Sequence, residues 1–117
     1  MIIDAGPFII DGENVNSRLW ALIKRAAQRD ADLHTTHPVL AQVWRQPSRQ
    51  ANLARALRHF DIHPLDESVS VGRRLASSKT SDVVDAHLTV VAEGLGTYIL
   101  TSDPDDKARL EARYERY

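Results

Sequence analysis

The chain has 117 residues, of which 43% are hydrophobic and 26% charged, enough for one hydrophobic core and too few for two. Its formal net charge of -1 gives no general attraction to nucleic acid or to an anionic membrane, so any site for a polyanion must be local. The absence of cysteine excludes disulfides and thiolate metal sites. We therefore expect a single domain over residues 1–117.

The N-terminal segment lacks the basic flank and the long apolar run of a signal peptide. No stretch of the sequence approaches the length that spans a membrane. These features predict a cytoplasmic location and no membrane partner.

Short apolar runs alternate with helical patterns along the chain, and the Gly6-Pro7 pair predicts a break after the first run. In chain order, the pattern predicts a strand over residues 1–5, a helix over 16–29 capped by Asn16 or Ser17, a strand over 32–36, helices over 38–45 and 49–60 interrupted at 46–48, a strand over 61–65, helices over 66–78 and 82–92, a strand over 97–101, and a charged helix from about 104 to 117. Alternation of this kind is typical of a parallel sheet covered by helices on both faces. The apolar first strand is expected at the centre of the sheet, and Pro64 places the third strand at an edge.

Four aspartates lie at the ends of these elements. Asp4 ends the first strand and Asp103 follows the fourth, while Asp82 and Asp85 open the helix that leads into the fourth strand. In an open parallel sheet, ligands bind beyond the carboxyl ends of the strands, where the strand order reverses. We therefore expect these carboxylates to meet at one edge of the sheet.

Neighbouring carboxylates repel one another, and protonation or a divalent cation relieves the repulsion. Ligands that offer only oxygen atoms favour Mg²⁺ or Mn²⁺ over zinc. A bound cation of this kind can activate water and neutralise a phosphodiester oxygen. The four aspartates therefore favour metal-dependent phosphodiester hydrolysis.

Each aspartate also has a structural interpretation. Asp82 is a favourable N-cap, and Asp85 lies in the first helical turn, where the helix dipole stabilises an acid. Asp103 can open the last helix. Asp4 ends a predicted strand and has no helix of its own to cap, which indicates a role in a site.

Four segments of the sequence, in this order and spacing, resemble the PIN domain of VapC-type toxins: Met1–Gly6, Pro38–Trp44, Asp85–Ala92 and Ile99–Asp103. They are spread over essentially the whole chain. The resemblance implies an α/β fold of three layers, α/β/α, with a central parallel sheet of four to five strands. It further implies a metal-dependent endoribonuclease toxin that uses Mg²⁺ or Mn²⁺, has RNA as its substrate, binds a cognate antitoxin and forms a homodimer.

The resemblance also assigns the candidate ligands. Asp4, Asp85 and Asp103 match the family's first, third and fourth catalytic, metal-binding acids. Gln42 stands where the second acid is expected, and its neutral carbonyl oxygen would be a weak or outer ligand. Asp82 has no firm counterpart and is an additional candidate ligand. The chain ends soon after the predicted last helix, which leaves open whether the family's fifth strand is present.

RNA binding requires local cations, and Arg45 and Arg49 lie on or beside two successive predicted helices. They are candidate RNA contacts, although a solvated helix face is the more common explanation for such arginines. The five histidines show no metal-binding spacing.

Two alternatives to the nuclease remain at this point. The main one is a degenerate PIN-like domain that binds RNA or a protein partner without cleaving RNA. A receiver-like signalling domain is disfavoured because the third predicted strand ends at Pro64-Leu65 and not at a phosphate-accepting aspartate.

Overall fold

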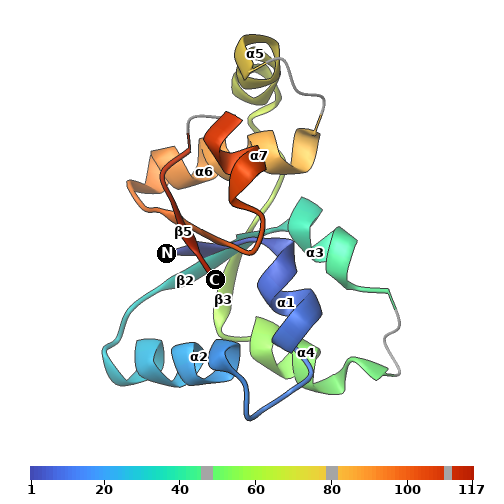
Figure 1. The fold of residues 1–117 in the computed structure, drawn as a ribbon, viewed down its shortest axis with the longest axis vertical. Helices are drawn as coiled ribbons and strands as arrows, with labels where there is room; N and C mark the ends of the chain where they lie inside the picture. The colour runs from blue at the N-terminus through green and yellow to red at the C-terminus, as the bar shows by residue number, and fades with distance from the viewer. Residues whose placement is uncertain (46–48, 79–81, 110–111) are drawn as a thin grey trace.

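The computed structural model describes residues 1–45, 49–78, 82–109 and 112–117, and it contains a five-stranded sheet between layers of helices (Figure 1). In chain order the elements are β1 (Ile2–Ile3), α1 (Ala5–Asp11), α2 (Arg18–Gln28), β2 (Leu33–Thr36), α3 (His37–Val43), α4 (Ala51–Leu57), β3 (Phe60–His63), α5 (Ser68–Ser78), α6 (Val83–Leu95), β4 (Ile99–Thr101), α7 (Pro104–Arg109) and β5 (Tyr114–Arg116). The predicted interruption at residues 46–48 lies outside the described residues.

All neighbouring strands are parallel, and their order in the sheet is β3-β2-β1-β4-β5. The chain therefore builds the sheet first on one side of β1 and then on the other. This order confirms that the first strand is central and that the third lies at an edge. The order in which strands are added to the sheet therefore reverses direction next to β1. The carboxyl ends of β1 and β4 lie together at this point.

In three of the helices a side chain caps the N–H three residues later. The acceptors are Ser17 for α2, Thr36 for α3 and Asp82 for α6. Each bond satisfies an N–H that has no partner within its helix. Gly96 ends α6 with a φ of 65°, a left-handed conformation that glycine adopts readily. The predicted caps at Ser17 and Asp82 are thus confirmed.

A helix follows β1 directly, whereas the sequence predicted a break at Gly6-Pro7. Pro7 is the third residue of α1, within the first turn, where a missing N–H removes no helical hydrogen bond and the fixed φ suits the helix. Gly-Pro here belongs to the start of a helix, so the predicted break was wrong.

The end of the chain contains a strand where the sequence predicted one continuous helix. After α7, β5 pairs with β4, so the fifth strand is present. The last residue, Tyr117, links the end of β5 to the rest of the fold. Its backbone N–H donates to the Thr101 carbonyl at 2.7 Å, and its hydroxyl donates to the Asp11 carboxylate. The Arg18 guanidinium lies over the Tyr117 ring at 4.8 Å from its centroid.

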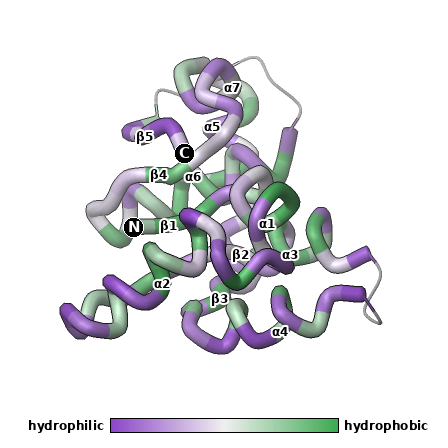
Figure 2. The backbone as a smooth tube through the Cα atoms, turned by 60° about the horizontal axis from the view of Figure 1, so that its bottom comes forward, coloured by the Kyte–Doolittle hydropathy of each residue, from purple (hydrophilic) through white to green (hydrophobic). Residues whose placement is uncertain are grey.

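The core fills the space between the sheet and the helices. Its fully buried side chains include Ile2, Ile3, Leu19, Val39 and Ile99. Figure 2 shows the apolar character of β1 and the hydrophilic character of β5. Among the described residues, no helix combines the length and the apolar character needed to cross a bilayer.

Candidate functional site

A cavity of about 220 Å³ lies beyond the carboxyl ends of β1 and β4. Its walls come from the β1–α1 junction, α3, the start of α6, the residues after β4, and α7. All five residues that the sequence indicated as ligands line it, together with Lys107: they are Asp4, Gln42, Asp82, Asp85 and Asp103. The structure thus brings the predicted set together, while their roles as ligands stay predictions.

Asp4 is held by three donors. Its Oδ1 accepts a hydrogen bond from the Ala5 N–H at 2.7 Å, which makes Asp4 the N-cap of α1. Its Oδ2 accepts from the Thr101 hydroxyl at 3.0 Å and lies 3.0 Å from the Lys107 ammonium. The expectation that Asp4 has no helix to cap was wrong, because the helix that it caps was not predicted. Capping and donor contacts fix this carboxylate in one orientation.

Asp85 projects into the same cavity from the first turn of α6, and Asp82 accepts its backbone N–H at 3.0 Å. Burial raises the pKa of Asp85 to about 6; the hydrogen bond and charge of Lys107 oppose this rise, and the negative charges of Asp4 and Asp82 add to it. The Asp85 carboxylate is therefore poised between its charged and neutral forms near pH 6.

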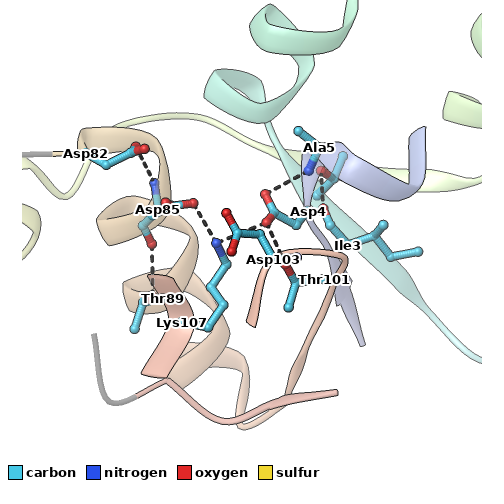
Figure 3. A network of polar contacts seen from close by, with 10 residues as sticks. Ile3, Asp4, Ala5, Asp82, Asp85, Thr89, Thr101, Asp103 and Lys107 are labelled. Carbon is cyan, nitrogen blue, oxygen red and sulfur yellow. Dashed lines mark hydrogen bonds and ion pairs between the residues drawn. The ribbon is translucent and has the colours of Figure 1, made fainter. Parts of the chain in front are cut away.

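Lys107 is the principal group of this site that the sequence did not indicate. Its Nζ lies 2.6 Å from Asp85 Oδ1 and 3.0 Å from Asp4 Oδ2, and its side chain is 1% exposed (Figure 3). Burial lowers the pKa of this ammonium, but the charge of Asp4 and the hydrogen bonds to Asp85 and Asp4 outweigh that effect, so the pKa is raised and the group stays charged. A buried cation thus joins two carboxylates from different elements.

The remaining members of the cavity are more accessible. Asp103 is exposed, and its backbone N–H donates to the Thr101 hydroxyl at 2.9 Å, which ties it to the support of Asp4. Figure 3 shows its carboxylate beside Asp4 and Lys107. Gln42 is half-buried on α3. Four carboxylates and one ammonium leave a formal excess of three negative charges when all are ionised.

The oxygen atoms that line this cavity are suitable ligands for a hard divalent cation. Carboxylate oxygens and the Gln42 amide oxygen are the ligand types that Mg²⁺ and Mn²⁺ prefer. The excess of negative charge favours a cation further. The Lys107 ammonium already lies between Asp4 and Asp85, two of the carboxylates that would hold such a cation. A cation held by both of them would have to displace or shift this ammonium.

The two arginines indicated as RNA contacts lie next to this cavity and not within it. Arg45 and Arg49 line a groove of about 510 Å³, and Gln42 lines both that groove and the acid cavity. The Arg45 Nε donates to the backbone carbonyl of Gln42 at 2.7 Å. The groove thus offers positive charge at the margin of a negative cavity.

The sequence matches no family model and no curated protein. Two solved structures share its arrangement of elements. A chain in the crystal structure of VapBC2 from Rickettsia felis, bound to a DNA fragment from their promoter, superposes with a TM-score of 0.73 over 99% of this chain and 97% of that one, at 11% sequence identity. The fold is PIN-like.

PAE2754 from Pyrobaculum aerophilum shares this PIN-like fold, with a TM-score of 0.64 and 19% identity over 97% of this chain and 81% of that one. At these identities the likeness concerns the path of the backbone. The chemistry of this chain therefore depends on its own residues.

Proposed function

We propose that this chain is a metal-dependent endoribonuclease and the toxin of a toxin–antitoxin pair. One observation carries the proposal: four carboxylates from three separate parts of the chain line one cavity at the point where the strand order changes direction. The structural likeness to a chain of a VapBC complex supports the toxin–antitoxin context.

The roles of the residues follow from their positions. Asp4, Asp85 and Asp103 would hold the Mg²⁺ or Mn²⁺, with Gln42 as a weaker neutral ligand and Asp82 near the coordinated waters. When bound, the cation supplies an activated water for in-line attack on a phosphodiester and neutralises charge on its oxygens. Arg45 and Arg49 would bind the RNA backbone beside the cavity.

Lys107 adds a requirement to this scheme. Its ammonium must leave the position between Asp4 and Asp85 before both carboxylates can face a metal. Once displaced, the ammonium remains within reach of the cavity through its flexible stem and can contact a phosphate oxygen of the substrate. Lys107 would then act as a positioning group for RNA.

The same lysine favours the second candidate function, a PIN-like domain that binds RNA or protein without cleavage. In that case the ammonium replaces the metal permanently, and the acids stabilise the fold through Lys107 and through helix capping. The replacement of the family's second acid by Gln42 points in the same direction, because a neutral ligand weakens divalent binding.

The partners in this proposal are RNA, a cognate antitoxin protein and a second copy of the chain. The support for the antitoxin is the VapBC likeness; RNA and the homodimer rest on the resemblance to VapC-type toxins. Because RNA is the substrate, we place the activity in the cytoplasm.

Cleavage of a mixed RNA substrate in the presence and absence of Mn²⁺ separates the two functions. We expect fragments only with the metal, and we expect Asp4→Asn to abolish them. Asparagine is an equally good N-cap, so this variant keeps the start of α1 and removes one charge. RNA that is bound but left intact by the wild-type chain at all Mn²⁺ concentrations would establish the binding module instead.

A further inference from the structure

A second group of ligand atoms lies on the edge of the sheet formed by β2 and β3. His34 of β2 is directly opposite Asp61 of β3 in the parallel register, and His63 follows two residues later. Because side chains alternate between the faces of a strand, Asp61 and His63 project to the same face. Asp32 lies two residues before His34, just ahead of β2. Two adjacent strands thus present imidazole and carboxylate groups together.

The distances between these groups are close to those of a metal site. His34 Nδ1 lies 3.0 Å from His63 Nε2 and 3.8 Å from Asp61 Oδ2. Ligand atoms of Asp32, His34 and Asp61 all lie within 4.8 Å of one another. Two nitrogen ligands of a tetrahedral Zn²⁺, each about 2.0–2.1 Å from the metal, are roughly 3.3 Å apart. The two imidazole nitrogens therefore need to move by only a few tenths of an ångström to admit an ion, while the exposed carboxylates of Asp32 and Asp61 must close in by up to about 1.5 Å.

The two imidazoles point nitrogen atoms at each other, and their ring centroids are 5.1 Å apart. When both rings are neutral, their contact holds a single hydrogen, so only one of the two nitrogens donates. A metal ion placed between them would accept the lone pairs of both nitrogens at once. The paired strands hold the rings in this arrangement before any ion binds.

This cluster is distinct from the acid cavity. None of its four members lines that cavity. The backbone N–H of His34 donates to the Met1 carbonyl, which lies at the opposite end of β1 from Asp4. Its donor set also differs, since two nitrogen and two carboxylate ligands suit zinc-class ions and oxygen ligands suit Mg²⁺.

We propose that Asp32, His34, Asp61 and His63 form a binding site for a zinc-class transition metal ion, separate from the acid cavity. The ion would link β2 to the edge strand β3 and stabilise their pairing. The five histidines show no metal-binding spacing along the sequence because the ligands come from two strands that meet only in the folded sheet.

Titration of the full chain with Co²⁺ tests the site, because tetrahedral Co²⁺ absorbs visible light and Mg²⁺ does not. We expect a saturable absorption band at one Co²⁺ per chain, which Zn²⁺ removes and excess Mg²⁺ leaves unchanged. His63→Gln should weaken Co²⁺ binding about tenfold or more, because a ligand is lost. Asp4→Asn should leave the band unchanged.

Two further variants keep the test decisive. The Asp61 side chain is 69% exposed, so we expect Asp61→Asn to fold normally and to weaken binding about tenfold. His37→Gln, which removes an exposed histidine outside the cluster, should bind as the wild type does. The proposal is overturned if the wild type shows no saturable band, if Asp61→Asn binds Co²⁺ as tightly as the wild type, or if Asp4→Asn or His37→Gln removes the band.

Discussion

Lys107 is the one cation among the described residues that line the acid cavity, and it contacts two of the four carboxylates. With its side chain 1% exposed and two carboxylates within 3.0 Å, its ammonium compensates charges that would otherwise be buried without a neighbouring cation. We predict that Lys107→Met lowers the free energy of unfolding without metal by roughly 3 kcal/mol, since the variant leaves two carboxylates uncompensated. The same variant should be stabilised more strongly by Mn²⁺ than the wild type, because no ammonium competes for Asp4 and Asp85.

Thermal unfolding at increasing Mn²⁺ concentration measures both effects, and Lys24→Met is the matched control because Lys24 is exposed on α2. The control should behave like the wild type. An equal response of Lys107→Met and the wild type to Mn²⁺ would contradict a competition between lysine and metal.

The raised pKa of Asp85, about 6, predicts a dependence on pH. Because an unfolded aspartate titrates at about 4, the native chain binds more protons than the unfolded chain between about pH 4 and pH 6. The contribution of Asp85 to stability is therefore present below about pH 4 and is lost as the pH rises through about 6. The free energy of unfolding of Asp85→Asn should lack this decrease.

The same proton competes with the metal. Because a metal ligand must be deprotonated, the affinity for Mn²⁺ should fall on the order of tenfold per pH unit below about pH 6 and level off above it. Calorimetric titrations between about pH 5 and pH 7.5 measure this. An affinity that is constant over the range would show that Asp85 is not a ligand.

The contact between α1 and the residues after β4 forms part of the wall of the acid cavity. A Cβ added to Gly6 would lie 1.7 Å from Ser102 Oγ and 2.9 Å from Ser102 Cβ. We predict that Gly6→Ala destabilises the fold by about 1–3 kcal/mol, because the two segments must move apart. Ser102→Gly in the same chain should restore part of the loss.

Gly94→Ala is the control for this pair, because a Cβ there meets nothing within 4 Å and lies within α6. The control should be neutral or slightly more stable, since alanine favours a helix. Chemical denaturation of the two single variants and the double variant gives the free energies. A Gly6→Ala chain as stable as the wild type would show that the space between Gly6 and Ser102 can accept a Cβ atom.

The elements that the sequence did not predict have physical reasons. The start of α1 contains Gly6 and Pro7, two residue types that usually interrupt helices and strands. The close approach of Ser102, which only the folded structure reveals, explains the glycine. The strand β5 has exposed, largely charged residues, Tyr114–Arg116, which carry no apolar pattern. Lys107 has acidic neighbours in sequence and therefore resembles a solvent-exposed residue of a charged helix. Lys107 follows Asp103 by four residues, one turn into the predicted last helix, and that spacing was the available signal.

The general architecture was predictable because its signals are cumulative. Apolar strands alternating with amphipathic helices specify a parallel sheet, and a buried first strand specifies its centre. Once these are set, the convergence of Asp4, Asp85 and Asp103 follows from the topology. What occupies the space between those acids depends on one side chain from the last helix, which no pattern of that kind specifies.

The protein as a whole therefore combines an acid cavity at the change in strand order with a buried lysine that contacts two of its carboxylates, the position that we propose for a metal ion. A crystal structure of the wild-type chain grown with Mn²⁺ tests this directly, through anomalous difference density. We predict a peak bridged by Asp4 and Asp85, with Asp103 within coordination distance and the Lys107 ammonium moved away. A cavity without anomalous density, in which Lys107 still contacts both carboxylates at saturating Mn²⁺, would contradict the account.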